Sequence, residues 1–182
     1  MYTYPHTIQN KQGEKLVFLR KVADASGDWL EVENFVQPKA GPPMHVHWKQ
    51  DESLTVVKGK IGYQLLDGEE KFAGPGETVT FHSGEWHRFW NAGDEVLNCS
   101  GWVKPAHNIE YFLTEIYKAM DNGTNNRPEA NAATFLMIRY KSEFDMAAIP
   151  GFVKKVILPV QFFIGNLLGR HKQFKDAPQP VR

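Results

Sequence analysis

Three histidines and one glutamate in the first half of the chain have the types and spacings that bind a divalent metal ion. His45 and His47 are separated by one residue, so on an extended strand both imidazoles point to the same face. A turn or short loop can bring Glu52 back toward them, and His87 arrives from a distant segment. This mixed nitrogen and oxygen set suits iron, manganese, nickel, copper or zinc, whereas calcium and magnesium prefer more oxygen ligands.

Two matched motifs make this metal-site interpretation stronger than a His-x-His pair alone. The first motif consists of His45, His47, Glu52 and Gly59, and the second consists of Gly76, Gly84, His87 and Asn91. Together they resemble the two motifs of the cupin superfamily, and the chain looks most like its quercetin-dioxygenase-like branch. The resemblance implies that His45, His47, Glu52 and His87 are metal ligands.

The chain departs from the family pattern at two positions. Gly41 is closer to the first histidine than the usual glycine, and Pro42 and Pro43 stiffen the approach, which shortens a loop and leaves the ligands intact. His82 stands where the second motif usually has proline. We favour a turn residue at this position, with a hydrogen-bond donor to a ligand or a proton shuttle as the alternatives.

The elements that must position these residues are short strands. Runs of β-type residues alternate with turns from about residue 14 to 104, which is typical of a barrel or a sandwich. Gly59 and Gly68 mark candidate hairpins, so we expect successive strands to be antiparallel neighbours. The resemblance implies a mainly β fold, a cupin jelly-roll barrel over residues 1–104, with the ligands facing its cavity. The predicted strands span residues 15–23, 29–36, 44–48, 53–57, 61–66, 78–81, 86–90 and 96–103.

A period of three to four residues replaces this pattern after Pro105 and predicts a C-terminal extension of about three α-helices, over residues 105–182. Asn108 is a candidate N-cap for the first helix. The apolar stripes are Ile109, Phe112, Leu113, Ile116 and Met120; then Ala133, Leu136, Met137, Tyr140 and Phe144; and then Val153, Val156, Ile157, Val160, Phe163, Ile164, Leu167 and Leu168.

The third stripe has three interpretations. It is too short for a membrane span and contains Pro159, Gln161 and Asn166. We expect it to pack on the barrel or across a homodimer interface. Contact with a membrane surface is the weaker alternative, suggested by the basic residues at both ends.

Composition excludes several classes of protein. The 21 basic and 21 acidic residues balance, and neither sign forms a long run, so nucleic acid is not an expected partner. Cys99 is the only cysteine, which excludes an internal disulfide, and we expect an inert buried thiol there. The N-terminus has no visible secretory signal, so the expected location is the cytoplasm.

The ligand set leaves coordination positions free, as in catalytic metal sites. Alternation along its strand places Phe89 and Asn91 on the same face as His87, whereas Trp86 and Trp90 face the other way, where we expect them to be buried against the C-terminal helices. The aromatic residues favour an apolar or planar small-molecule substrate. We therefore expect a metal-dependent dioxygenase in which Glu52 also exchanges protons with the substrate. The alternatives are a metal-dependent isomerase or lyase acting on a sugar or keto acid, and a noncatalytic small-ligand-binding protein.

Overall fold

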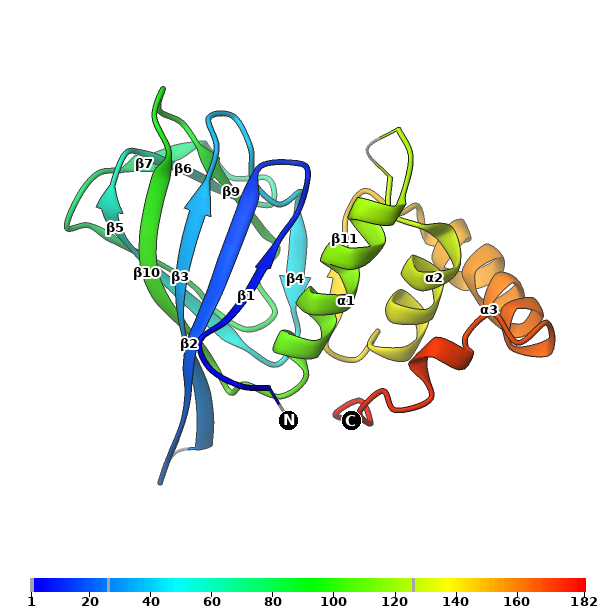
Figure 1. The fold of residues 1–182 in the computed structure, drawn as a ribbon. Helices are drawn as coiled ribbons and strands as arrows, with labels where there is room; N and C mark the ends of the chain where they lie inside the picture. The colour runs from blue at the N-terminus through cyan, green and yellow to red at the C-terminus, as the bar shows by residue number, and fades with distance from the viewer. Residues whose placement is uncertain (1, 26, 126) are drawn as a thin grey trace.

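Two antiparallel sheets form the β part of the protein in the computed structural model, which describes residues 2–25, 27–125 and 127–182 (Figure 1). The first sheet has the strand order β1-β2-β3-β10-β5-β8. The strands of this sheet are β1 (His6–Gln9), β2 (Glu14–Asp24), β3 (Gly27–Val36), β10 (Leu97–Lys104), β5 (Asp51–Lys58) and β8 (Thr78–Phe81). The second sheet contains β11 (Phe144–Met146), β4 (His45–His47), β9 (His87–Asn91), β6 (Ile61–Leu65) and β7 (Lys71–Ala73), in that order.

The predicted strands all correspond to observed ones, and the mainly β jelly-roll barrel is confirmed. One of the two expected hairpins is present, because β6 and β7 pair across the turn at Gly68. The hairpin expected at Gly59 is wrong. This glycine, with a φ of 89°, carries the chain from β5 in the first sheet to β6 in the second, so the two strands are not neighbours.

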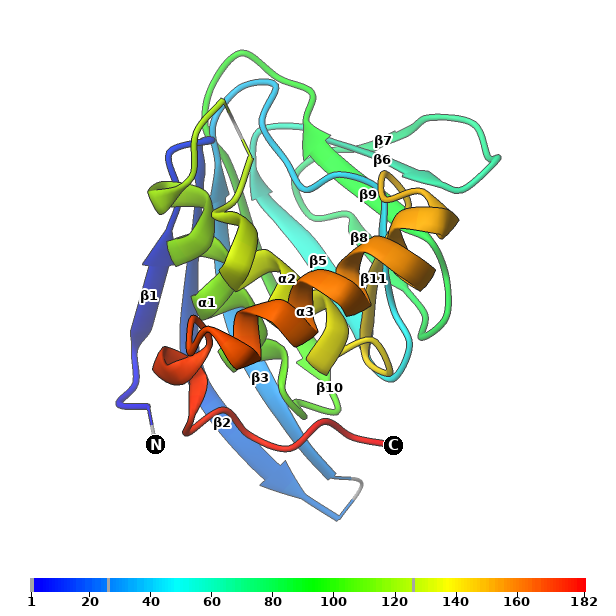
Figure 2. The same ribbon diagram turned by 90° about the vertical axis from the view of Figure 1, so that its right-hand side faces the viewer.

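Helices follow the barrel strands, as the sequence predicts. They are α1 (Ile109–Asn122), α2 (Ala130–Arg139), the π-helical turn η1 (Val153–Ile157), α3 (Leu158–Leu167) and the 3-10 turn η2 (Lys172–Phe174). Figures 1 and 2 show α1 and α2 beside the barrel and α3 on the outer side of α2. Within the described residues, no helix is long and apolar enough to cross a membrane.

The prediction that Phe144 belongs to the second helix is wrong. The helix ends at Arg139, and Phe144 begins the short strand β11, which pairs with β4 at the edge of the second sheet. The C-terminal extension therefore contributes a strand to the sheet that carries three of the predicted ligands. We propose that the chain divides into a barrel of residues 1–104 and a helical extension of residues 105–182, and that this extension also supplies β11.

Two apolar clusters hold the elements together. One fills the barrel and contains Leu54, Ile61, Phe81, Phe89 and Leu97 among its buried residues. The other lies between the barrel strands and the helices, where residues of β2 and β3 meet those of α1 and α2. Each sheet buries an apolar face and each helix an apolar stripe, so the helices cover apolar surface that the second sheet does not reach.

Glu143 joins three distant segments beside β11. Its side chain is fully buried and accepts hydrogen bonds from Asn108, from the Gln50 amide at 3.4 Å and from the backbone N–H of Val181 at 2.9 Å. The side chain of Asn108 donates to Glu143 and to the carbonyl of Gln179, so it makes no capping bond to α1, although the helix begins directly after it.

Candidate metal centre

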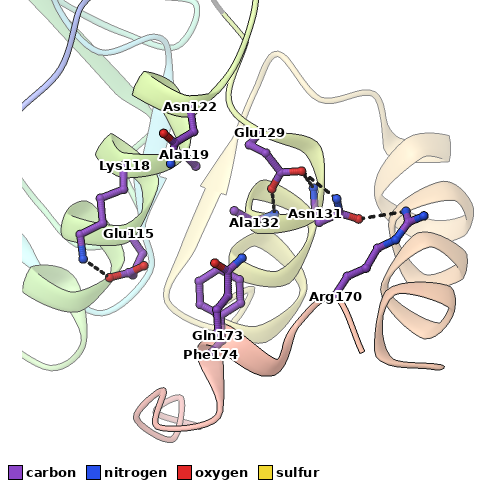
Figure 3. Close-up of a pocket in the computed structure, with 10 residues that line it drawn as sticks. All are labelled: Glu115, Lys118, Ala119, Asn122, Glu129, Asn131, Ala132, Arg170, Gln173 and Phe174. Carbon is purple, nitrogen blue, oxygen red and sulfur yellow. Dashed lines mark hydrogen bonds and ion pairs between the residues drawn. The ribbon is translucent and has the colours of Figure 1, made fainter. Parts of the chain in front are cut away.

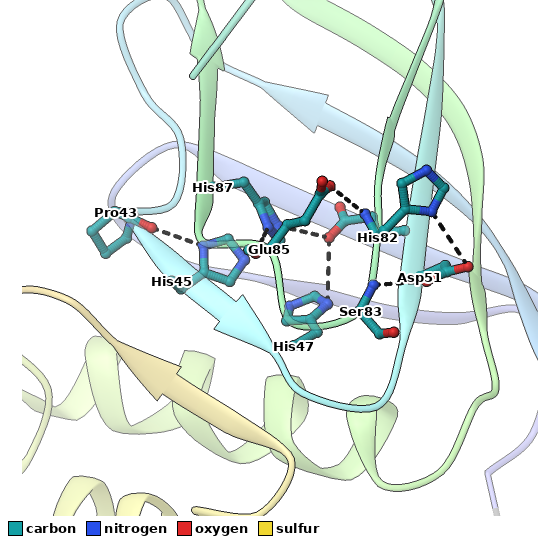
Figure 4. A network of polar contacts seen from close by, with 9 residues as sticks. Pro43, His45, His47, Asp51, His82, Ser83, Glu85 and His87 are labelled. Carbon is teal, nitrogen blue, oxygen red and sulfur yellow. Dashed lines mark hydrogen bonds and ion pairs between the residues drawn. The ribbon is translucent and has the colours of Figure 1, made fainter. Parts of the chain in front are cut away.

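The four predicted ligands come together between the two sheets. His45 and His47 lie on β4 and His87 on β9 of the second sheet, where His45 and His87 are paired, whereas Glu52 comes from β5 of the first sheet. One potential ligand atom from each residue lies within 4.8 Å of all the others. Figure 4 shows the imidazoles of His45, His47 and His87 gathered at this point. The cluster is able to hold a metal ion.

Backbone carbonyls orient two of the imidazoles. His45 Nδ1 lies 2.8 Å from the carbonyl oxygen of Pro43, and His87 Nδ1 lies 2.9 Å from that of Glu85 (Figure 4). A carbonyl can only accept a hydrogen bond, so each Nδ1 carries the proton. In the neutral ring the other nitrogen, Nε2, then has a free lone pair. This arrangement is the usual one for histidines that bind metals.

Two buried nitrogen atoms in the cluster lack hydrogen-bond partners among the residues that the structure describes. They are His47 Nδ1 and His87 Nε2, which lie 3.7 Å and 3.6 Å from Glu52 Oε2, beyond hydrogen-bond range. A buried polar atom without a partner is costly, and a bound cation would satisfy both nitrogens together. The donor set and its unpaired atoms therefore fit a divalent transition metal.

The protonation states also fit a metal site. Burial, together with the neighbouring His47 and His87, lowers the pKa of His45 to about 3. Burial lowers the pKa of His47 to about 4, with Glu52 opposing the shift. Burial alone would raise the pKa of Glu52, but the three histidines lower it to about 2. At neutral pH the cluster thus presents neutral His45 and His47 and an ionised carboxylate, the forms that bind metals.

Aromatic rings enclose the cluster from two sides. Phe81 of β8 stacks on His87 with ring centroids 4.1 Å apart and an angle of 7° between the planes. Phe144 of β11 meets His47 edge-on, at 5.7 Å and 90°. Reasoning from the sequence did not place either ring at the site. Alternation in β8 offered a weak signal for Phe81, whereas nothing in the spacing of residues 133–144 distinguished Phe144 from a helix residue.

His82 lies in the turn that follows β8, as favoured from the sequence. The backbone N–H of Glu85 donates to the carbonyl of His82 at 3.0 Å, which closes this turn. The imidazole is exposed and lies 3.7 Å from a carboxylate oxygen of Asp51 (Figure 4). Its side chain therefore belongs to the surface beside the cluster.

The expected alternation of side chains along β9 is present. His87, Phe89 and Asn91 are buried, whereas Arg88 and Trp90 are partly exposed. The Asn91 amide donates to the carbonyls of Val36 and Glu95, which is a structural role.

The expected burial of the two tryptophans against the helices is wrong for Trp90. Its ring contacts Phe72 of β7 and Arg88 of its own strand. Trp86 does meet the extension, because the Lys154 ammonium of η1 lies 5.4 Å from the centre of its ring.

A separate surface hollow lies between α1, α2 and the segment after α3 (Figure 3). The Glu129 carboxylate at its edge accepts hydrogen bonds from the backbone N–H groups of Asn131 and Ala132. These bonds cap the N-terminus of α2. The carboxylate thus serves helix stability, and the metal-type cluster lies elsewhere, between the sheets.

The fold and the site together assign the class of this protein. It is a jelly-roll β-barrel protein with three histidines and one glutamate, able to hold a metal ion, between its two sheets. Residues 35–100 match the family model of the cupin domain, and this range includes all four residues. The chain therefore carries a cupin domain within these residues.

Two curated fungal proteins are similar to part of the chain. The probable oxidoreductase virH of Hypocrea virens is 31% identical over 68 residues, which are 36% of this chain and 31% of virH. The oxidoreductase iacF of Pestalotiopsis fici is 33% identical over 76 residues, 40% of this chain and 37% of iacF. The chain thus spans about a third of the length of these relatives.

Among solved structures, an uncharacterised protein of Klebsiella pneumoniae with a double-stranded beta-helix domain is similar at a TM-score of 0.47 and 19% identity. This similarity covers 54% of this chain and 83% of that protein.

Proposed function

We propose that the protein is a metal-dependent oxidoreductase of dioxygenase type that acts on an apolar or aromatic small molecule. The observation that carries this proposal is the cluster of His45, His47, Glu52 and His87, with two buried imidazole nitrogens that lack partners among the described residues. The names of the two fungal relatives as oxidoreductases support the reaction class.

The four residues would hold the metal, and each is prepared for that role. Hydrogen bonds to Pro43 and Glu85 fix the rings of His45 and His87, so little side-chain entropy is lost when an ion binds. The lowered pKa of Glu52 keeps its carboxylate charged, which balances part of the charge of a divalent cation. A bound iron, manganese, nickel or copper ion would supply redox chemistry or polarise an oxygen atom of the substrate.

The surrounding residues would select the substrate. Phe81 and Phe144 border the cluster, and Tyr63 contacts Phe81 with ring centroids 6.2 Å apart. His45 is partly exposed, so the cluster is accessible from its side. Flat apolar walls beside a charged centre fit a substrate with a planar ring and an oxygen atom that can approach the metal. In this arrangement Glu52 acts as a charged ligand, and its lowered pKa disfavours a role as proton donor.

Metal loading followed by oxygen measurement tests this function. The protein is stripped of metal, loaded without oxygen with each first-row divalent ion in turn, and then mixed with flavonols or diketones in an oxygen electrode. We expect oxygen uptake that depends on one of the redox-active metals and is lost in His87→Ala. Turnover of a sugar or keto acid without oxygen would instead identify an isomerase or lyase. Absence of uptake with every metal would overturn the oxygenase proposal.

A further inference from the structure

The helical segment from η1 to α3, with Phe152 and Leu168 that flank it, has an outer face that is almost entirely apolar. Its inner side is covered, because Leu158 and Phe162 pack against the core between the helices and Gly165 lies against the His171 ring. Figure 2 shows α3 running across the outside of the molecule, in front of α2. The exposed apolar residues, with the exposed fraction of each, are Phe152 (65%), Val156 (43%), Ile157 (37%), Val160 (52%), Phe163 (69%), Ile164 (44%), Leu167 (76%) and Leu168 (58%).

The two amide side chains on this segment are exposed, but both are hydrogen-bonded to the rest of the protein. The Gln161 side chain accepts a hydrogen bond from Thr134 of α2, and the Asn166 side chain pairs with the His171 ring at 2.9 Å. No charged residue occurs between Lys155 and Arg170. A helix that is apolar on all sides is normally covered, and a contiguous apolar surface of this kind marks an interaction site.

Charge distribution indicates the chemistry of the partner. The segment from residue 146 to 175 contains five lysines and arginines and no acidic residue, although the whole chain has 21 of each sign. The rest of the chain therefore contains 16 basic residues (21 − 5) and all 21 acidic residues, so it carries a net negative charge. Lys154 is paired with Asp145 at 2.8 Å. The other basic residues lie toward the two ends of the apolar face, Lys155 near its start and Arg170, Lys172 and Lys175 after its end.

This charge pattern disfavours a second copy of the chain as the partner. Two such helices packed antiparallel about a two-fold axis would bring Lys155 of one copy near Arg170 of the other, and the segment has no carboxylate to separate them. An anionic lipid surface offers acyl chains to the apolar residues and negative headgroups to both basic ends. The segment is too short to span a bilayer, so it would lie in the plane of the surface.

We propose that the η1–α3 segment docks the protein on an anionic lipid surface. Phe163 and Leu167, the two most exposed residues of this face, enter the boundary between headgroups and acyl chains, and Lys155 and Arg170 contact the headgroups. Lys154 and its partner Asp145 link this segment to β11, which lies beside the metal-type cluster. Docking would therefore hold the cupin barrel close to the surface, where apolar small molecules partition.

Vesicle sedimentation of the full chain tests the proposal. The probes are vesicles of phosphatidylcholine alone and of phosphatidylcholine mixed with phosphatidylglycerol. We expect binding to the mixed vesicles that weakens as salt is raised, because surface charges are screened. Two double variants test the two kinds of contact. Phe163→Asp combined with Leu167→Asp places charges on the apolar face, and Lys155→Glu combined with Arg170→Glu reverses the charge at its ends. Each double variant should reduce binding by about tenfold or more. The matched control is Val57→Asp with Leu66→Asp, two similarly exposed apolar residues on the barrel, which should bind as the unmodified protein does.

A labelling experiment measures insertion without disturbing the charge. Burial raises the pKa of the Cys99 thiol to about 12, and Cys99 is only 1% exposed, so a dye reacts selectively at Phe163→Cys or at the control Val57→Cys. An environment-sensitive dye should shift to the blue only at position 163 and only with the mixed vesicles. Equal binding of the Phe163→Asp, Leu167→Asp variant would overturn the proposal. So would a concentration-dependent dimer that this variant dissociates, with no vesicle binding, because the face would then belong to a second copy.

Discussion

The ring of Phe144 meets the ring of His47 edge-on, with the ring centroids 5.7 Å apart. The two residues are also register partners in the pairing of β11 with β4, so their side chains project from the same face of the sheet. Phe144 stacks in turn on Phe112 of α1, with centroids 4.3 Å apart. A residue of the helical extension is thus part of the wall of the metal-type cluster, and it connects this cluster to the core of the extension.

Phe144→Leu should weaken metal binding by about tenfold, because it removes the ring that holds His47 in place. It should lower the free energy of unfolding by only about 1 kcal/mol, since it largely conserves volume. Calorimetric titration with zinc measures the first effect and urea unfolding the second. The control is Phe174→Leu in the same core cluster, which should lose similar stability and keep its metal affinity. Equal affinities of the two variants would contradict a role for Phe144 at the site.

His47→Ala should abolish stoichiometric metal binding, because the cluster then loses one of its three imidazoles. His82→Ala is the matched control, since it removes an exposed imidazole from a nearby turn, and it should keep the full metal content. Elemental analysis of both variants, purified in parallel, provides the measurement. Retention of metal in His47→Ala would refute the ligand assignment.

Stability of the metal-free protein should fall as the pH drops below about 6.5. The folded-state pKa values of His45 and His47 are about 3 and 4, both below the ordinary histidine value of 6.5. Between the folded and unfolded values the unfolded chain binds more protons, so acid favours unfolding. Each group contributes a slope of up to about 1.4 kcal/mol per pH unit. The stabilising effect of Glu52, with its pKa of about 2, is lost only at lower pH, below the ordinary glutamate value of 4.5.

Urea unfolding at a series of pH values measures this dependence. His47→Gln removes one of the titrating groups, so the difference in slope between the unmodified protein and this variant isolates the contribution of His47. Parallel curves for the two proteins between pH 6.5 and pH 4 would contradict the lowered pKa of His47.

Glu143→Gln should destabilise the protein by about 1 to 3 kcal/mol, because an amide replaces two acceptor oxygens that serve Asn108, Gln50 and Val181 with one acceptor and one donor. Glu95→Gln is the control, since Glu95 forms an exposed ion pair with Lys58 and should contribute less than about 1 kcal/mol. Thermal and urea unfolding provide the measurement, and equal stability of the two variants would show that the Glu143 network is dispensable.

The sequence by itself determined the chemistry and the local geometry of the candidate site. The residue types and spacings of His45, His47, Glu52 and His87 were sufficient, because side-chain alternation along a strand is a local property of the backbone. The same rule correctly placed Phe89 and Asn91 on the face of His87. Helical periodicity identified α1 and α3 for the same reason.

Tertiary structure alone decided three further features. Phe144 continues a helical period, yet it lies in β11, because the open edge of β4 offers backbone hydrogen bonds that a local pattern cannot reveal. The turn at Gly59 resembles a hairpin, but its two strands belong to opposite sheets, since long-range pairing of β5 with β8 and β10 decides their neighbours. The apolar residues of α3 look like core residues in the sequence, and only the packing of Leu158 and Phe162 shows that one side of this helix is covered while the other side is exposed.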